Sequence, residues 1–253
     1  MAHPDWPELA NVRFEPVTQG MSGALLFRLT EDNQLPRYLK IGRDDAATSL
    51  RGEIARTRWL TVQNVRVPLI LRVKDQPGYT AMLTRAVPGM PAEQSSLPTE
   101  RVIESLAHGL AALHRLPSTD CPFDESLRVR LTRATAAVAS GEVDSGDFEP
   151  RNRRTAPEAL LARLKQDVPV QDIVVVHGDA TLTNLIVDGD GVLGFVDCGN
   201  AGRGDRYLDL AVIHAGIEQH FGGAAAEYFL RTYGIRDWDT AKALYFSDLY
   251  ELF

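Results

Sequence analysis

The pattern of apolar residues changes near residue 90, and this change constrains the fold more than any other feature of the chain. Before it, runs of apolar and β-favouring residues predict strands at 12–18, 24–30, 38–41, 69–73 and 79–83, with one helix at 47–63. The Val-Pro-Gly-Met-Pro segment at 87–91 interrupts regular structure. We therefore predict a strand-rich domain over 1–88 and a mainly helical domain over 89–253.

The second region combines helices with a few short strands. Helical spacing of apolar residues predicts helices at 99–115, 124–140, 157–167, 205–220, 223–233 and 239–253. Strands are expected at 173–177, 185–188 and 192–197, and the Asp-Gly-Asp-Gly sequence at 188–191 predicts a hairpin turn between the last two. Residues 141–156 are polar and predict a mobile or loosely held segment.

Composition argues against several classes of protein. Of the 253 residues, 44% are apolar and 24% charged, as in an ordinary globular protein. No apolar run approaches the roughly 18 residues of a membrane helix, and the N-terminal residues lack the pattern of a secretory signal. The two cysteines, Cys121 and Cys198, form no C-x-x-C motif. We therefore expect a cytoplasmic protein that has no membrane partner, disulfide scaffold or structural zinc site.

Charge is distributed unevenly along the chain. The net charge of −7 argues against a nucleic-acid partner. Residues 1–90 contain 12 basic and 9 acidic side chains, for a net charge of +3, whereas residues 91–253 contain 15 and 25, for −10. This contrast favours different ligands for the two regions, although a solubilising acidic surface explains it equally well.

One segment has the pattern of a phosphoryl-transfer site. Residues 177–184 read His-Gly-Asp-Ala-Thr-Leu-Thr-Asn, and residues 197–199 read Asp-Cys-Gly. Asp179 and Asn184 have the spacing of a kinase catalytic loop, and Asp197 takes the place of the aspartate in the Asp-x-Gly motif. Transfer from ATP requires a group that orients the attacking hydroxyl and oxygen ligands for Mg²⁺. We predict that Asp179 has the first role, and Asn184 and Asp197 the second.

The first region supplies other parts that such a site needs. The Gly-Met-Ser-Gly sequence at 20–23 lies between two predicted strands, where backbone N–H groups can approach phosphates. Lys40 lies in a predicted strand and is suited to contact the α- and β-phosphates, and Glu53 on the next helix can pair with it. Each piece alone has an ordinary alternative, a hairpin turn or an exposed charge. The chain contains no Walker A or G-x-G-x-x-G motif, which argues against a P-loop or a Rossmann site. The combination of the glycine-containing turn, Lys40 and Glu53 with the loop at 177–184 indicates a kinase-like site.

With these motifs, the chain resembles the aminoglycoside phosphotransferases, and among them the 3′-phosphotransferase group. Further similarity lies in Asp-Arg-Tyr-Leu-Asp-Leu-Ala at 205–211 and Glu-Leu-Phe at 251–253, and it covers nearly the whole chain. The resemblance implies an α+β, protein-kinase-like two-lobed fold, with a small, mainly antiparallel β N-terminal lobe carrying one helix and a larger, mainly helical C-terminal lobe. It also implies Mg²⁺-dependent transfer of the γ-phosphoryl group of ATP to an aminoglycoside hydroxyl, expected to be the 3′-hydroxyl, which would confer antibiotic resistance.

The resemblance also implies further site residues. On the nucleotide side, Ser22, Arg85 and Val87 join Lys40 and Glu53. On the substrate side, a polycation needs several carboxylates. The implied contacts are Asp144, Asp147, Glu149, Glu251 and Phe253, the last through a terminal carboxylate. Glu218 is expected to compensate partly for charged contacts that are missing from the helix after Asp209. Asp209 is expected to hold loop backbone or Arg206 rather than substrate.

The chain departs from the family pattern on the substrate side. Tyr250 stands where the common C-terminal motif has an acidic residue, and Asn200 stands where close relatives have arginine. Ala215, Gly216 and Gln219 occupy positions where relatives often carry charged contacts. Two alternatives therefore stay open: a kinase of another small hydroxylated molecule, such as choline, homoserine or a macrolide, and a non-catalytic nucleotide-binding module.

For the oligomeric state, we expect a monomer or weak dimer.

Overall fold

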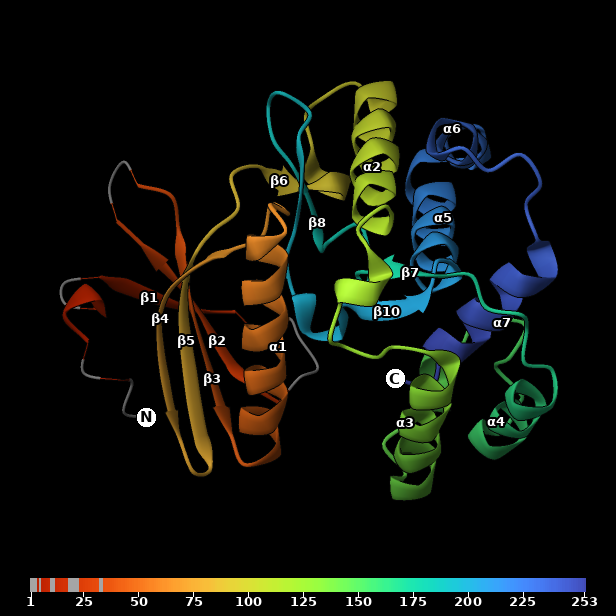
Figure 1. The fold of residues 1–253 in the computed structure, drawn as a ribbon, viewed down its shortest axis with the longest axis horizontal. Helices are drawn as coiled ribbons and strands as arrows, with labels where there is room; N and C mark the ends of the chain where they lie inside the picture. The colour runs from red at the N-terminus through yellow and green to blue at the C-terminus, as the bar shows by residue number, and fades with distance from the viewer. Residues whose placement is uncertain (1–3, 5, 10–11, 18–22, 32–33) are drawn as a thin grey trace. The chain divides into compact units, whose positions relative to one another are not determined.

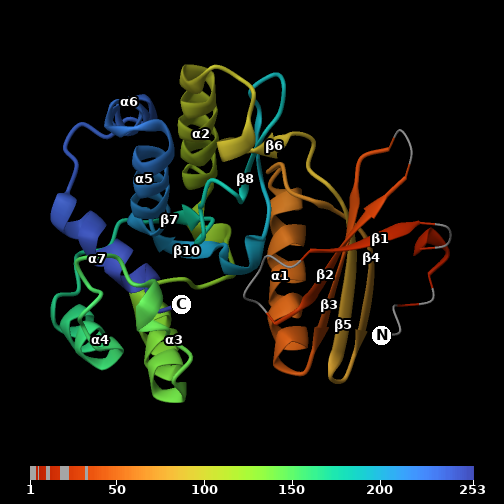
Figure 2. The same ribbon diagram turned by 180° about the vertical axis from the view of Figure 1, so that it is seen from behind.

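The computed structural model describes residues 4, 6–9, 12–17, 23–31 and 34–253, and the chain divides into two compact units. Unit 1 contains the residues up to 90 together with 194–199, and unit 2 contains 91–193 and 200–253. The chain thus returns to unit 1 for one short segment that includes Asp197. Figures 1 and 2 show the ribbon from opposite sides.

Unit 1 is built on a five-stranded antiparallel sheet. Its strands are β1 (Arg13–Val17), β2 (Leu25–Thr30), β3 (Arg37–Arg43), β4 (Leu69–Gln76) and β5 (Tyr79–Arg85), in the order β1-β2-β3-β5-β4. The helix α1 (Asp45–Val62) connects β3 to β4 and packs against the sheet (Figure 1). A short 3-10 helix, η1 (Pro7–Leu9), precedes β1. All five predicted strands and the predicted helix are present.

Side chains along β3 and β5 alternate between the two faces of the sheet. This alternation separates two apolar clusters and determines the face on which Lys40 lies. Leu39, Ile41 and Leu83 belong to one buried cluster of the sheet, whereas Met82 packs against α1 in the other. Lys40 is the cross-strand partner of Met82. Because successive side chains of a strand point to opposite faces, Lys40 lies on the face that α1 covers.

Unit 2 is mainly helical. Its helices are α2 (Thr99–His114), α3 (Leu127–Ser140), α4 (Pro157–Gln166), α5 (Tyr207–Phe221), α6 (Gly223–Tyr233) and α7 (Thr240–Tyr250). Figure 2 shows α6 beside α2 and α5, and α7 contacts α4 and α5. Short 3-10 helices form at η2 (Ala92–Gln94), η3 (Ser118–Asp120) and η4 (Ser145–Asp147). Leu160, Phe246 and Leu249 belong to a core cluster of unit 2, to which β7 also contributes.

Short strands between α4 and α5 frame the loop at 177–184. The strand β7 (Ile173–Val176) ends directly before it, and β8 (Leu185–Val187) follows it. The predicted turn at 188–191 is present, with the Gly191 N–H donating to the Asp188 carbonyl over 3.0 Å. The strand β9 (Leu193–Phe195) then carries the chain into unit 1, where η5 (Cys198–Asn200) begins. The two-residue strand β6 (Met90–Pro91) marks the earlier crossing.

The strand β10 (Gly202–Asp205), which pairs antiparallel with β7, is absent from the sequence prediction. Its Gly-Arg-Gly-Asp sequence has low strand propensity, so it was not distinguished from the helix expected at 205. Close packing explains the glycines. A Cβ atom at Gly202 would lie 2.8 Å from Cγ of Glu125, and one at Gly204 would lie 3.0 Å from the Glu125 carbonyl oxygen.

The polar segment at 141–156, predicted to be loosely held, is fixed at two buried residues. Phe148 lies in the core of unit 2, and Asn152 is also buried. The Asn152 amide donates to Asp248 on α7 over 2.6 Å. The polar composition of the segment did not predict this anchoring, because Asp248 lies almost one hundred residues further along the chain than Asn152.

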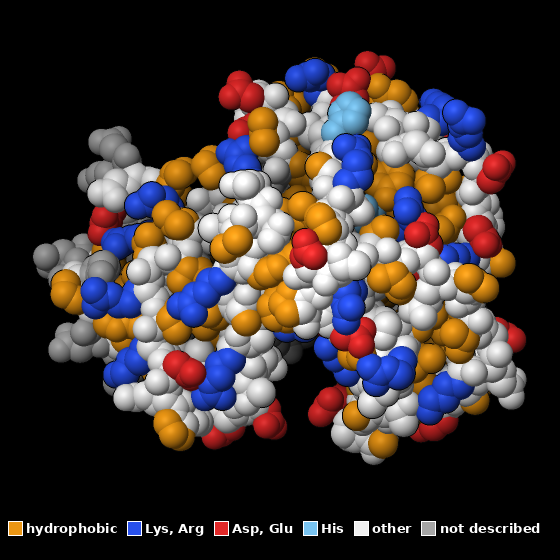
Figure 3. All heavy atoms as spheres, in the orientation of Figure 1, with side chains coloured by type: hydrophobic (Ala, Val, Ile, Leu, Met, Phe, Trp, Pro, Cys, Tyr) orange, Lys and Arg blue, Asp and Glu red, His pale blue; other side chains and the backbone are white. Residues whose placement is uncertain are grey.

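Surface charges are mixed on the face that Figure 3 shows. Acidic and basic side chains are interspersed over it, rather than gathered into large patches of one sign. Over the part of the chain that the structure describes, no helix combines the length and apolarity required to cross a bilayer.

Candidate functional site

The loop at 177–184 folds back so that its two key polar residues meet. The Asn184 side chain donates from Nδ2 to Asp179 Oδ2 over 2.9 Å and to the Asp179 carbonyl oxygen over 3.1 Å. Backbone hydrogen bonds from Thr181 to Asp179 and from Asn184 to Thr181 form the turns that bring them together. A spacing of five residues therefore becomes direct contact.

Asp209 on α5 anchors the start of this loop. Its carboxylate accepts the backbone N–H groups of His177 and Gly178, both over 2.7 Å, and His114 Nε2 lies 3.0 Å from Oδ2. Burial alone would raise the pKa of Asp209, but hydrogen bonds and the nearby imidazoles hold it below its ordinary value. The expectation that Asp209 holds loop backbone is confirmed.

Replacing Asp209 with asparagine should destabilise unit 2. The change leaves one of the buried N–H donors without an acceptor, so the free energy of unfolding at pH 7 should fall by about 1–3 kcal/mol. Because the folded-state pKa is depressed, this carboxylate stabilises the protein above the unfolded-state value near pH 4, and the contribution is lost as pH falls further. Urea unfolding at pH 7 and at successively lower pH should show a smaller acid-dependent loss in the variant. Matching curves would contradict this role.

A buried arginine supports the loop from its other side. Arg130 on α3 donates to the Gly178 carbonyl over 2.9 Å and forms a buried ion pair with Glu125 at 3.0 Å. Gly178 has φ +80, and a Cβ atom there would overlap Arg130 and the Asn200 backbone. Sequence reasoning missed Arg130 and Glu125, since a charged residue inside a helical pattern normally indicates an exposed face.

The second oxygen of Asp179 contacts the C-terminal helix. Tyr250 donates its phenol hydroxyl to Asp179 Oδ1 over 2.8 Å. Burial and the adjacent Asp179 carboxylate raise the pKa of Tyr250 above its ordinary value, so the phenol stays protonated and remains a donor at neutral pH. Both carboxylate oxygens of Asp179 therefore have a hydrogen-bond donor.

A network of charges joins α7 to the segment at 141–156. Arg151 contacts Asp248 and Glu251 over 2.9 and 3.1 Å, and Arg163 donates to Asp248 over 2.7 Å. Asn152 donates to both carboxylates. Only one oxygen of Glu251 is used. Its Oε2 is buried and has no hydrogen-bond partner among the residues that the structure describes. Burial accordingly raises the pKa of Glu251.

The other residues expected on the substrate side lie in several places. Asp144 is exposed and accepts the Gly146 N–H as the cap of η4. Glu149 is exposed, and its charge contributes to the raised pKa of Glu251. Glu218 is exposed on α5, and Phe253 places its ring 5.6 Å from the Arg130 guanidinium carbon. Asp147 lies within η4, and its side chain is outside the described residues.

Unit 1 brings together Lys40 and Glu53, two of the residues predicted for the nucleotide side, and Asp197, a predicted metal ligand. Lys40 Nζ lies 2.7 Å from Glu53 Oε2 and 2.9 Å from Asp197 Oδ1, so the expected Lys40–Glu53 pair is present. Burial alone would lower the pKa of Lys40, but the charges of the two carboxylates more than offset it and raise the pKa. Asp197 adopts φ +57, a left-handed conformation that Asp and Asn tolerate better than most residues.

Two other residues predicted for the nucleotide side, Arg85 and Val87, lie at and just after the end of β5. Arg85 ends β5 and is exposed, and Val87 is buried shortly after it. The N–H of Ala86, between them, donates to the Pro36 carbonyl over 2.8 Å. Ser22 lies outside the described residues.

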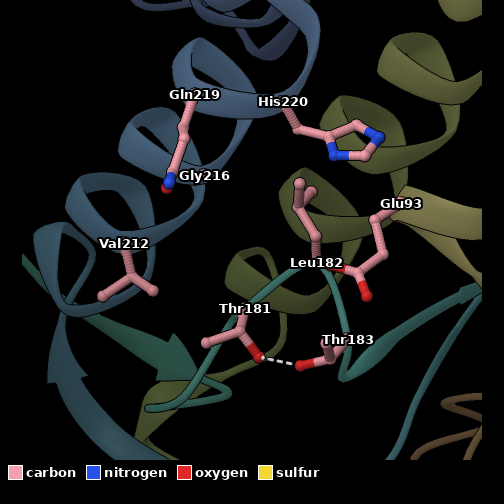
Figure 4. A pocket seen from close by; sticks show the side chains of 8 residues that line it. All are labelled: Glu93, Thr181, Leu182, Thr183, Val212, Gly216, Gln219 and His220. Atoms are coloured by element: carbon pink, nitrogen blue, oxygen red, sulfur yellow. Dashed lines mark hydrogen bonds between the residues drawn. The ribbon is translucent and has the colours of Figure 1, made fainter.

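A pocket of about 430 Å³ in unit 2 adjoins the loop (Figure 4). Thr181, Leu182 and Thr183 come from the loop, and Thr181 and Thr183 share a hydrogen bond of 2.9 Å. The other lining residues are Glu93 beside them and, from α5, Val212, Gly216, Gln219 and His220. Hydroxyl, amide, imidazole and carboxylate groups together suit a ligand rich in hydroxyl and amine groups. From the sequence, Gly216 and Gln219 stand out only because they differ from the charged residues that relatives often have there, and this difference does not predict that they line a pocket.

The fold and these two groups of residues define a kinase-like phosphotransferase: a strand lysine paired with a helix glutamate, and a His-x-Asp loop closed by asparagine. The chain matches the model of the phosphotransferase enzyme family over residues 13–244, and it belongs to that family.

Relatives are similar over nearly their whole length. The chain is 34% identical over 251 residues to an aminoglycoside 3′-phosphotransferase from Streptomyces fradiae, covering 94% of each chain. It is 34% identical over 246 residues to streptomycin 3″-kinase from Streptomyces griseus, covering 90% of this chain and 89% of that one. The solved structure of APH(3″)-Id from Streptomyces rimosus with ADP and streptomycin superposes with a TM-score of 0.85 at 31% identity, covering 97% of this chain and 94% of that chain. These similarities confirm the expected fold class.

Proposed function

We propose that this protein transfers the γ-phosphoryl group of ATP to a hydroxyl of an aminoglycoside, and thereby confers resistance to that antibiotic. The observation that carries the proposal is the Asp179 carboxylate, which Asn184 orients within the loop whose Thr181, Leu182 and Thr183 line the pocket. The acceptor oxygen attacks the γ-phosphorus, the bond from that phosphorus to the bridging oxygen of ADP breaks, and Asp179 takes the hydroxyl proton. The activities named for the relatives agree with this reaction.

Unit 1 is assigned the nucleotide and unit 2 the acceptor. Lys40, held by Glu53, supplies a positive charge for the phosphates. Arg85 and Val87 lie in the segment proposed to meet the adenine, and Ser22 belongs to the loop proposed to meet the phosphates. ATP is a cytoplasmic substrate, so the enzyme is expected to act there.

Asn184 and Asp197 have the ligand atoms that Mg²⁺ prefers. Asn184 donates through Nδ2, which leaves its amide oxygen as the ligand atom, and Asp197 offers a half-exposed carboxylate. Mg²⁺ usually keeps several water ligands and binds substrate phosphates, so one or two protein ligands suffice for it. When bound, Mg²⁺ neutralises charge on the transferred phosphate.

Glu251 supplies the chemical reason for a cationic acceptor. Its buried Oε2 has no donor among the described residues, and Glu149 adds negative charge nearby. An ammonium group bound close to this carboxylate would favour its ionised form and return the Glu251 pKa toward its ordinary value. Asp144, Asp147, Glu218 and Phe253 are proposed as further, outer contacts of a polycation.

A second candidate is phosphorylation of the 3″-hydroxyl of streptomycin. It is favoured by the equal identity, 34%, to relatives named for the 3′ and the 3″ positions. We place the 3′ reaction first because the C-terminal Glu-Leu-Phe sequence resembles the 3′ group.

Measurement of ADP release with ATP, Mg²⁺ and a panel of acceptors tests the proposal. We expect kanamycin or neomycin to raise the rate at least about tenfold over the acceptor-free rate, with one phosphoryl group added to the drug by mass spectrometry. An aminoglycoside that lacks the 3′-hydroxyl is the matched control and should give no product. Stimulation by streptomycin alone would favour the 3″ reaction. Stimulation only by choline, homoserine or a macrolide, or nucleotide binding without turnover, would contradict the proposal.

A further inference from the structure

The oxygens of Asp179 are already bound within unit 2. Asn184 Nδ2 donates to Oδ2 and to the carbonyl oxygen of Asp179, so that side is committed to orienting the carboxylate. Oδ1 is the oxygen that faces Tyr250, whose hydroxyl lies 2.8 Å away. An acceptor hydroxyl that donates its proton to Asp179 therefore meets Tyr250 at Oδ1.

We propose that the Tyr250 hydroxyl occupies, in the absence of acceptor, the position on Asp179 Oδ1 that the acceptor hydroxyl takes during turnover, and so keeps water from that position. The inference rests on the proposed role of Asp179 in orienting the acceptor. Tyr250 then competes with the acceptor hydroxyl for Asp179 Oδ1, and the acceptor displaces it on binding. Without an acceptor, the Tyr250 hydroxyl suppresses hydrolysis of ATP because it keeps water from this oxygen.

Three observations support this role. A phenol and an acceptor alcohol present the same O–H donor to a carboxylate. Tyr250 is 39% exposed at the last residue of α7, so its ring can turn outward without opening the core. The same end of α7 is fixed by Asp248, which Asn152 and Arg163 hold, and the hydroxyl therefore returns to Asp179 when the acceptor leaves.

Tyr250→Phe isolates the hydroxyl, because the ring remains and only the oxygen at Asp179 is removed. The space left beside an ionised carboxylate is polar and can accept a water molecule. We expect acceptor-free ATP hydrolysis to rise about three- to tenfold. The KM for the acceptor should fall by a similar factor, since no hydrogen bond to a charged group must be displaced. The value of kcat should stay within about threefold.

Tyr245→Phe is the matched control. Tyr245 lies on the same helix and donates its hydroxyl to the Leu164 carbonyl over 3.0 Å, away from Asp179. The same chemical change there should leave both hydrolysis and the acceptor KM unchanged. Thermal unfolding of both variants, measured beside the wild type, shows whether an activity change follows a loss of folded protein.

Unchanged hydrolysis and unchanged KM in Tyr250→Phe would overturn the inference. So would a large fall in kcat at constant KM, because Tyr250 would then assist the reaction rather than compete with the acceptor. Failure of the proposed function has a different result: the wild type would show no acceptor-stimulated turnover. Acceptor-free hydrolysis of the two phenylalanine variants would still test Tyr250 in that case.

Discussion

Asp179→Ala should lower kcat for acceptor phosphorylation by about 10²–10⁴-fold, the usual effect of losing a general base. The side chain orients the acceptor hydroxyl and receives its proton, and its position is fixed by Asn184. Nucleotide binding should change little, because the residues proposed to hold ATP belong to unit 1. Steady-state kinetics with the acceptor found in the panel, together with ADP binding by calorimetry, measure both effects.

The control for this experiment is Asp190→Ala. Asp190 is an exposed carboxylate in the turn that follows β8, so its removal changes the net charge of unit 2 by the same amount. Its kcat should match that of the wild type. If Asp179→Ala keeps kcat within about threefold of the wild type while Asp190→Ala does the same, Asp179 is not the base.

Asp197→Asn should produce the second large effect, a fall in kcat/KM of about 10²–10³-fold, as when a group that stabilises transition-state charge is removed. The concentration of Mg²⁺ that gives half-maximal rate should rise by at least about tenfold, the lower end of the effect of losing even an indirect metal partner. Asparagine also tolerates the left-handed conformation at this position, so the change removes charge rather than backbone fit. Initial rates measured over a Mg²⁺ titration test this prediction.

Asp75→Asn is a closely matched control in the same unit. The side chains of Asp75 and Asp197 are 50% and 51% exposed, and each forms one ion pair, Asp75 with Arg51 at 2.7 Å and Asp197 with Lys40 at 2.9 Å. The control should keep the wild-type requirement for Mg²⁺. An equal shift in the two variants would show that a general charge effect, rather than metal binding, is responsible.

The elements that sequence patterns predicted well are those with local causes. The sheet of unit 1, α1 and the helices of unit 2 follow from apolar periodicity, and the turn at 188–191 follows from its glycines. The strand β10 was missed because its glycines and charges have no strand propensity, and only the pairing with β7 and the lack of space beside Glu125 explain it. The segment at 141–156 was misjudged as loosely held for the same reason: its anchor on Asp248 is distant in sequence.

The sequence by itself determined which residues could carry phosphoryl transfer, because the spacing from Asp179 to Asn184 and the alternation that places Lys40 toward α1 are local properties of a turn and a strand. Only the tertiary structure decided what surrounds them. It bonded Tyr250 to Asp179 and Arg130 to the Gly178 carbonyl, and it left one oxygen of Glu251 without a hydrogen-bond donor among the described residues. Each of these contacts joins segments far apart in the chain, and their energies depend on burial and on partners that no local pattern records.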